Sequence, residues 1–258
     1  MNLEFQEPSG RVALVTGAAA GIGLAIAQEL AAAGFITVMA GRSPNVLEAA
    51  TSLAAKAKAP VSGHICDVAH EAQITDLMQL VDERFGRCDV LVNNAGIHPK
   101  KNGGKVMVEE TTTEQWNDVL AINLTAPFLF SRAVLPMMRR HGWGRIINIG
   151  SRGGRTASPA ASSHYAASKA GMIGFTRILA LEGAAIGVTA NYVAPGPIVT
   201  GMTAMSTPEV RATLAKSVPL GRYGEPSEIS SVVSFLASEG SSFMTGSIID
   251  VNGGSFMP

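Results

Sequence analysis

Short apolar runs alternate with amphipathic stretches along most of this 258-residue chain, and this alternation constrains the fold more than any other feature. The runs are rich in valine, isoleucine and alanine, and they are short enough to be buried strands. Strands that alternate with helices pair in parallel, because each helix carries the chain back across the sheet. The sequence therefore predicts an α/β fold with a doubly wound, seven-stranded parallel sheet flanked by helices on both faces. The expected strands are residues 11–16, 36–40, 61–68, 89–92, 145–150, 188–193 and 248–251.

The stretches between these runs predict the helices. A helix ends at Gly34, and two long helices are expected at 113–140, with kinks at Pro127 and Pro136, and at 165–186. A later helix starts at Pro208 with Thr207 as its cap. Shorter helices are expected at 44–58, 71–85 and 227–238. Length and a hydrophobic content of 47% fit one domain over residues 1–258, with its core at about 11–254.

Composition excludes several classes of protein. Lys+Arg and Asp+Glu both number 20 and aromatic residues make up 5%, which argues against a nucleic-acid partner. No apolar run is expected to reach the ~18 residues of a membrane span, and the N-terminus lacks the pattern of a signal peptide. Cys66 and Cys88 are expected to be reduced thiols, so the predicted location is the cytoplasm.

A glycine turn follows the first strand. Gly17, Gly21 and Gly23 lie between that strand and the next helix. Such a turn lets backbone N–H groups approach a phosphate, which then lies at the positive end of the helix. The alternative is a tight strand–helix turn without a ligand.

The end of the second strand bears on the choice of cofactor. In dinucleotide-binding folds an acidic residue here would bond the adenine ribose and favour NAD. The chain has Gly41, Arg42 and Ser43 instead. The planar guanidinium of Arg42 can hold a 2′-phosphate, so NADP(H) is favoured over NAD(H). The alternative is a solvated surface arginine.

A hydroxyl, a phenol and an amine are expected to meet near the fifth strand. Ser151 follows that strand, and ligands bind at the carboxyl ends of strands in open α/β sheets. Tyr165 and Lys169 are four residues apart and share one face of a helix. A nearby cation lowers the pKa of a phenol from its usual value of ~10. Tyr165 is therefore predicted to be a proton donor and acceptor.

Several motifs in this order resemble the short-chain dehydrogenase/reductase family over nearly the whole chain. They are Thr16 with the glycine turn, Asn93-Asn94-Ala95-Gly96, Asn123, Ser151, Tyr165 with Lys169, and Pro195-Gly196. The general look is closest to the 3-oxoacyl-acyl-carrier-protein reductase branch. The resemblance implies a Rossmann-type fold and an oxidoreductase that interconverts a ketone or aldehyde and an alcohol, with a hydride carried by the cofactor. It also implies a homotetramer, or a dimer, built on the two long helices.

The resemblance assigns roles to individual residues. Tyr165 is the general acid/base, Lys169 binds the nicotinamide ribose and lowers the pKa of Tyr165, Ser151 bonds the substrate carbonyl, and Asn123 holds a water in a proton relay. No metal ligands are implied. The implied cofactor-binding residues are Gly17, Ala19, Gly21, Ile22, Gly23, Arg42, Ser43, Asp67, Val68, Asn94, Ala95, Gly96, Tyr165, Lys169, Pro195, Gly196, Ile198 and Thr200.

Three departures from the family pattern affect the substrate. Ser151 lies fourteen residues before Tyr165 instead of the usual thirteen, which places Arg152 at the usual position of the serine. The segment 97–112 is longer than usual. Leu181 stands where carrier-protein reductases tend to have a basic residue.

The substrate is therefore left open. The pocket is expected from the loops 97–112, 152–164 and 197–218, and the cations there could attract an anionic substrate or could simply be solvated. Those cations are Lys100, Lys101, Lys105, Arg152 and Arg155. The alternatives are a 3-oxoacyl-carrier-protein or acyl-coenzyme A reductase, and an NAD-dependent alcohol, sugar or steroid dehydrogenase. A catalytically silent dinucleotide-binding regulator is disfavoured, because such a protein need not keep Ser151, Asn123, Tyr165 and Lys169.

Overall fold

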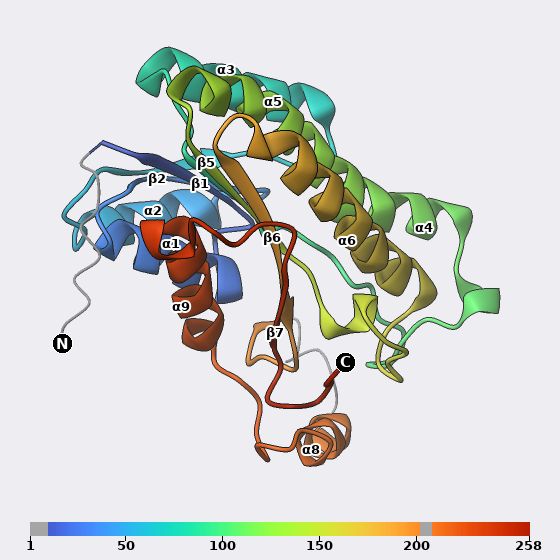
Figure 1. Ribbon diagram of the computed structural model, residues 1–258. Coiled ribbons are helices and arrows are strands. Elements are labelled where there is room, and N and C mark those ends of the chain that lie inside the picture. Colours follow the sequence, from blue (N-terminus) through green and yellow to red (C-terminus); the bar gives the residue numbers. More distant parts are fainter. Residues whose placement is uncertain (1–9, 202–207) are drawn as a thin grey trace.

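The computed structural model describes residues 10–201 and 208–258 and is built on a sheet of seven parallel strands (Figure 1). Their order in the sheet is β3-β2-β1-β4-β5-β6-β7, so the chain winds outward from β1 in one direction and then in the other. The predicted doubly wound, seven-stranded sheet is confirmed. The strands are β1 (Val12–Thr16), β2 (Ile36–Gly41), β3 (Val61–Ile65), β4 (Val90–Asn93), β5 (Gly144–Ile149), β6 (Val188–Pro195) and β7 (Ile248–Val251).

Helices cover both faces of the sheet (Figure 1). One layer contains α1 (Gly21–Ala32), α2 (Asn45–Ala54) and α9 (Pro226–Ala237). The other contains α3 (Glu71–Phe85), α5 (Ala126–His141) and α6 (Ser163–Ala184), with α4 (Thr113–Leu120) against α6. The short helix α8 (Pro208–Lys216) lies apart from both layers, and the predicted cap Thr207 is outside the described residues.

The side chains of each central strand contribute to two hydrophobic cores, one on each face of the sheet. Neighbouring side chains of a strand point to opposite faces, so Leu14 and Val15 on β1 belong to different clusters, as do Ile146 and Ile147 on β5. The helices complete each core with the apolar side of their own surface. Strands buried on both faces explain why these runs are almost continuously apolar.

The predicted helix at 113–140 is confirmed as one helical stretch, Thr113–His141, whose hydrogen bonding changes part-way along it. A widened π-helical turn, Ala121–Thr125, separates α4 from α5. Pro127 lies in the first turn of α5, where its missing N–H costs nothing, and only Pro136 lies inside a helix. The break falls at Asn123, and π turns of this kind are frequent at functional sites.

The same stretch corrects a second expectation. Residues 113–141 are long and apolar enough to cross a membrane by length and composition alone. Side chains such as Leu129, Phe130 and Val134 are buried in the core on the α3 side of the sheet. The stretch is therefore accounted for as a core helix.

Other predicted boundaries shift by a few residues. The third strand ends at Ile65, so Asp67 and Val68 follow it in a loop. The helix predicted at 44–58 ends at Ala54, and the one predicted from 165 begins at Ser163. Cys66 and Cys88 are free and buried.

Candidate active site

Hydrogen bonds join the glycine turn between β1 and α1 to the residues that follow β4. The side-chain amide of Asn94 donates to the carbonyl oxygens of Thr16, at 2.8 Å, and Gly17, at 3.1 Å. The hydroxyl of Thr16 accepts from the backbone N–H groups of Asn94 and Ala95, each at 3.0 Å. Asn94, which was expected to contact the cofactor ribose, thus also holds the turn in shape.

Only glycine fits this turn. Gly17 has a φ of +65°, and a Cβ on it would lie 2.9 Å from the Cα of Ala95. A Cβ on Gly23 would lie 2.2 Å from the carbonyl oxygen of Gly17. The bare backbone at the start of α1 has the form of a cradle for a phosphate, as a dinucleotide requires.

A hollow of about 290 Å³ runs from this turn to the end of β5. It brings together most of the residues predicted from the sequence, and backbone at Ala20, Ile149, Gly150 and Gly201 adds to its wall. The predicted residues that line it are Gly17, Gly21, Ile22, Gly23, Asn94, Ala95, Gly96, Ser151, Tyr165, Lys169, Pro195, Gly196, Ile198 and Thr200.

The other predicted cofactor residues lie outside this hollow. Arg42 and Ser43 are exposed just after β2, and Asp67 and Val68 follow the neighbouring strand β3. Ala19 lies on the glycine turn. A Cβ added to Gly41 would lie 3.7 Å from the Cβ of Ala19, so the turn is close to the end of β2. These residues extend the site along the carboxyl edge of the sheet, toward β2 and β3.

Ser151 and Tyr165 meet despite the longer spacing between them. The two side chains lie next to each other, since a Cβ on Gly153 would lie 3.4 Å from Oγ of Ser151 and 3.8 Å from Cε1 of Tyr165, and both line the hollow. The additional residue is taken up by a 3-10 turn, Arg152–Gly154, which packs directly on α6. A Cβ on Gly154 would lie 2.6 Å from the backbone of Lys169, so this approach depends on glycine.

The pKa of the Tyr165 phenol departs from the sequence expectation. Burial raises this pKa, and the hydrogen bond with Ser151 offsets part of the rise. The amine of Lys169 is 5.9 Å from the centre of the phenol ring and donates to the carbonyl oxygen of Ile149 at 2.8 Å. The predicted lowering of the pKa by Lys169 is therefore wrong for the free protein.

Lys169 itself is almost fully buried in the wall of the hollow, with 3% of its surface exposed. Burial lowers the pKa of its amine to about 8, because desolvation disfavours the charged form. An anionic ligand in the hollow would favour the charged form again.

Asn123 is fully buried at the π turn and fixes the start of the loop 97–112. Its Oδ1 accepts from the N–H of Ile97 at 2.8 Å, and its Nδ2 donates to Ile97 O and to the hydroxyl of Ser168. A Cβ on Gly96 would lie 3.3 Å from Oδ1 of Asn123 and 3.5 Å from Nζ of Lys169. Gly96 thus keeps open the space between these two polar atoms.

Two residues of the site were missed by sequence reasoning. The hydroxyl of Tyr192, on β6, accepts from the N–H of Ser151 at 2.8 Å and fixes that backbone. The ring of His98 stacks on the phenol of Tyr165 with centroids 4.1 Å apart. The position of His98 two residues after Gly96 was a usable signal, whereas nothing in the sequence of a buried strand distinguishes Tyr192.

A second hollow of about 150 Å³ adjoins the first on the other side of Ser151 and Tyr165. His98, Lys100 and Arg152 line it. Arg155, in contrast, forms an ion pair with Asp250, and Lys101 pairs with Glu110 at 2.6 Å.

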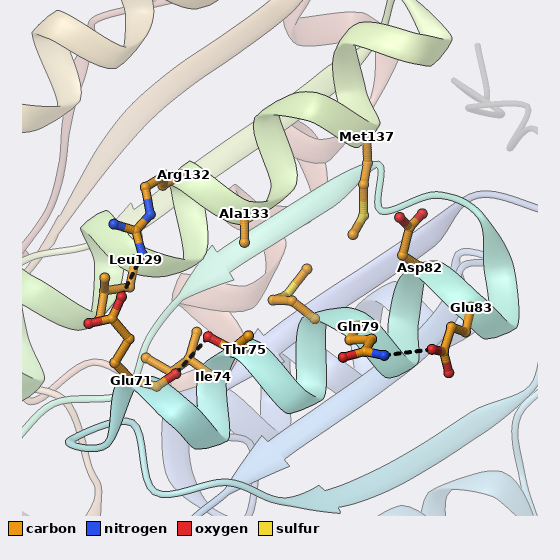
Figure 2. Close-up of a pocket in the computed structure, with 11 residues that line it drawn as sticks. Glu71, Ile74, Thr75, Gln79, Asp82, Glu83, Leu129, Arg132, Ala133 and Met137 are labelled. Carbon is orange, nitrogen blue, oxygen red and sulfur yellow. Dashed lines mark hydrogen bonds and ion pairs between the residues drawn. The ribbon is translucent and has the colours of Figure 1, made fainter.

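A larger hollow of about 680 Å³ lies between α3 and α5 and contains none of these residues (Figure 2). An ion pair between Arg132 and Glu71 bridges its two helices. Its walls carry Asp82, Glu83 and Gln79 but no cradle and no phenol. Size alone therefore does not mark the chemical site of this molecule.

Similarity to known proteins decides the family. A family model described as Enoyl-(Acyl carrier protein) reductase matches residues 17–255. The chain belongs to the short-chain dehydrogenase/reductase family. It is thereby an NAD(P)-dependent oxidoreductase that acts on the alcohol or keto group of a small molecule.

Individual members of the short-chain dehydrogenase/reductase family match nearly end to end. The 3-oxoacyl-[acyl-carrier-protein] reductase FabG of Haemophilus influenzae is 41% identical over 249 residues, which are 96% of this chain and 99% of that protein. A 3-oxoacyl-[acyl-carrier protein] reductase from Brucella melitensis with bound NAD has a TM-score of 0.90 at 35% identity, covering 100% and 99% of the two chains. A putative NAD(P) dependent gluconate 5-dehydrogenase from Beutenbergia cavernae with bound NADP has a TM-score of 0.90 at 35% identity, covering 97% and 98%.

Proposed function

We propose that this enzyme is an NADP(H)-dependent carbonyl reductase in which Tyr165 is the general acid and base. One observation carries the proposal. Ser151 and Tyr165 lie next to each other in the wall of a hollow that also contains Lys169 and the glycine cradle. A hydroxyl, a phenol and an amine beside a dinucleotide cradle suit reversible transfer of a hydride and a proton.

The cofactor fits the cradle because the glycine turn excludes side chains where a pyrophosphate would lie. Gly17, Gly21 and Gly23 would face the pyrophosphate, and Asp67 and Val68 the adenine. Ile198 and Thr200, which line the far part of the hollow, would hold the carboxamide. The bound nicotinamide dinucleotide supplies or accepts the hydride.

The protein residues handle the proton and the developing charge. Tyr165 donates its proton to the carbonyl oxygen of the substrate, and the raised pKa of its phenol keeps that proton in place at neutral pH. Ser151 donates a hydrogen bond to the same oxygen. Lys169 holds the nicotinamide ribose, and the space at Gly96 between Lys169 and Asn123 can hold the water of a proton relay.

Arg42 supports a preference for NADP(H) over NAD(H). The guanidinium is exposed at the end of β2, and the position before it is Gly41 instead of an acid. A 2′-phosphate on the adenine ribose would gain a charge-assisted bond there, and NAD would gain none. The solved relatives carry either NADP or NAD, so this preference belongs to the proposal.

The second candidate function is 3-oxoacyl-carrier-protein reductase, which is the activity named for the relatives in Haemophilus and Brucella. The identity of about two residues in five over nearly the full length favours it. Leu181 counts against it, because this leucine is 74% exposed on α6 where a basic residue would dock the acidic carrier.

We further propose a single-domain cytoplasmic homotetramer, with a dimer as the alternative. Its substrate loops are 97–112, 152–164 and 197–218. Exposed apolar side chains on α5 and α6, namely Phe128, Ile178 and Leu181, support a subunit interface on these helices. The free thiols of Cys66 and Cys88 support the cytoplasmic location. Light scattering after gel filtration tests the oligomeric state, and a monomer would contradict it.

A carbonyl screen tests the function. Oxidation of NADPH and NADH is followed at equal concentrations with ketones, aldehydes, sugars, keto acids and acetoacetyl-carrier protein. Turnover of at least one class with NADPH, lost in Tyr165→Phe, is expected. Turnover that persists in Tyr165→Phe would exclude the proposed role of the phenol. Binding of NADPH without turnover of any carbonyl would favour the silent regulator.

A further inference from the structure

The second hollow combines two cations with no acid. Lys100 and Arg152 line it together with the proposed reacting groups Ser151 and Tyr165, and none of the described residues that line it is a carboxylate. It shares Ser151 and Tyr165 with the first hollow, so a substrate bound in it would lie beside the proposed reacting groups.

Within residues 10–201 and 208–258, the two cations are bonded only to neutral acceptors. The amine of Lys100 donates to the carbonyl oxygen of Ala160 at 3.2 Å. The guanidinium of Arg152 donates to Ser255 O at 3.1 Å and to the hydroxyl of Ser158 at 3.4 Å. Neutral acceptors orient a cation but leave its charge uncompensated, and desolvation makes such a charge attract an anion more strongly.

Two neighbouring cations, in contrast, are paired with acids. Arg155, three residues after Arg152, is paired with Asp250, and Lys101, next to Lys100, is paired with Glu110. Lys100 and Arg152, which line the second hollow, have no such acid among the described residues. Lys100 is half-buried, and desolvation lowers the pKa of its amine, as expected for a cation without a counter-charge.

His98 adds a neutral donor to the same wall. Its Nε2 accepts from the backbone N–H of Ser162 at 3.2 Å, and a backbone N–H can only donate. The ring proton is therefore on Nδ1. Burial lowers the pKa of this imidazole to about 3, so the ring stays neutral while it stacks on Tyr165. The wall thus offers N–H donors from His98, Lys100 and Arg152 around the phenol.

We propose that this hollow selects a small ketone or alcohol that carries an anionic group, a carboxylate or a phosphate, bound by Arg152 and Lys100. The inference rests on the proposed function and names its substrate class. The volume of about 150 Å³ equals the share of roughly five water molecules in the liquid, which suits a short chain of carbon atoms. The planar fork of Arg152 can bind either anion with two parallel bonds.

Matched pairs of substrates test this inference. Oxidation of NADPH is measured with acetoacetate and ethyl acetoacetate, with 5-ketogluconate and fructose, and with dihydroxyacetone phosphate and dihydroxyacetone. We expect kcat/KM to favour the charged member of at least one pair by about tenfold or more, as for one charge-assisted hydrogen bond. A preference confined to the first two pairs identifies a carboxylate, and one confined to the third identifies a phosphate.

Two variants and a control locate the effect. Arg152→Gln and Lys100→Gln should each reduce the preference by about tenfold, mainly through KM of the charged member. Lys105→Gln removes the same charge from an exposed position of the same loop and should leave the preference unchanged. Equal preference in all four proteins, or a wild type that favours the neutral members, would overturn the inference.

A binding measurement separates this inference from the proposed function. Calorimetric titration of the enzyme with acetoacetate and with inorganic phosphate, in the presence of NADP, needs no turnover. Binding of one anion that is lost in Arg152→Gln supports the anion site even if no substrate is reduced, in which case the proposed function fails alone. Absence of binding for both anions, with neutral ketones reduced, overturns the anion site alone.

Discussion

The two ends of the proposed cofactor site are built in different ways. At the reacting end, Tyr165, Lys169 and Ser151 are each fixed by protein contacts: the stack with His98, the bond to Ile149 O and the bond to Tyr192. At the adenine end, Arg42 and Ser43 are exposed, and Asp67 is held by bonds within its own segment: its N–H donates to Gln73, and its carboxylate accepts from the N–H of Ala69.

The difference follows from what each end must do. Proton transfer needs groups held within a fraction of an ångström of the working geometry, so the free protein already carries that order. Recognition of a 2′-phosphate needs only charge within reach, and an exposed arginine provides it without a rigid shell. Substitutions at the reacting end should therefore affect rate or stability strongly, and those at the adenine end should change the choice of cofactor alone.

The largest effect is expected from Tyr165→Phe. Loss of the general acid should reduce kcat by about 10²–10⁴-fold, while the affinity for NADPH stays within a few-fold. Single-turnover kinetics and a fluorescence titration with NADPH measure the two quantities.

Tyr192→Phe is the matched control, since it removes the other phenol hydroxyl near Ser151. It leaves the N–H of Ser151 without its partner and should lower kcat by only about tenfold. Equal losses in the two variants would mean that Tyr165 acts through structure and not as an acid.

Asn123→Ala should show how far the reacting end depends on its buried network. The variant leaves both backbone groups of Ile97 and the hydroxyl of Ser168 without their present partner. The hydroxyl of Ser168 keeps its bond to Tyr165 O, so the free energy of unfolding should fall by about 2–6 kcal/mol, at ~1–3 kcal/mol for each of the two Ile97 groups left unpaired. Urea denaturation measures this, with Asn117→Ala on the exposed side of α4 as the control. A loss under about 0.5 kcal/mol, the usual range for surface substitutions, would contradict a stabilising role.

A moderate effect is expected from pH, through Lys169. Its amine has a pKa lowered to about 8, so it loses its proton as pH rises through 8. The dinucleotide is anionic and binds better to the protonated form, so affinity for NADPH should fall by about tenfold between pH 7 and pH 9. Kd measured at several pH values tests this. Lys169→Met should bind more weakly at pH 7 and show a flatter profile, whereas an unchanged profile would exclude Lys169 as its source.

The smallest effect is expected from Arg42→Ala. The ratio of kcat/KM for NADPH over NADH should fall by about tenfold, which corresponds to one charge-assisted bond. Because the guanidinium is exposed, the melting temperature should not change. Arg139→Ala, another exposed arginine, is the control for net charge. If the variant kept its preference for NADPH, other residues along the β2–β3 edge would have to recognise the 2′-phosphate.

Much of the fold could be predicted because it depends on local patterns. Runs of valine and isoleucine marked the strands, and the glycine spacing marked the turn that the structure shows beneath Asn94. The π turn at Asn123 could not be predicted, because it depends on a bond to Ile97, whose loop is distant in the sequence. The contact of Ser151 with Tyr165 was expected, although how the chain absorbs the additional residue was not.

By itself the sequence determined which chemical groups this enzyme has and the order in which the strands carry them to one edge of the sheet. Tertiary structure alone decided their electrostatic state. Burial raised the pKa of Tyr165 and lowered that of Lys169. Asp250 on the distant strand β7 neutralised Arg155, and Glu110 of the same loop neutralised Lys101, whereas Arg152 and Lys100 line the second hollow. Desolvation and pairing depend on what packs around a group from other parts of the chain, and the order of residues along the chain does not contain that information locally.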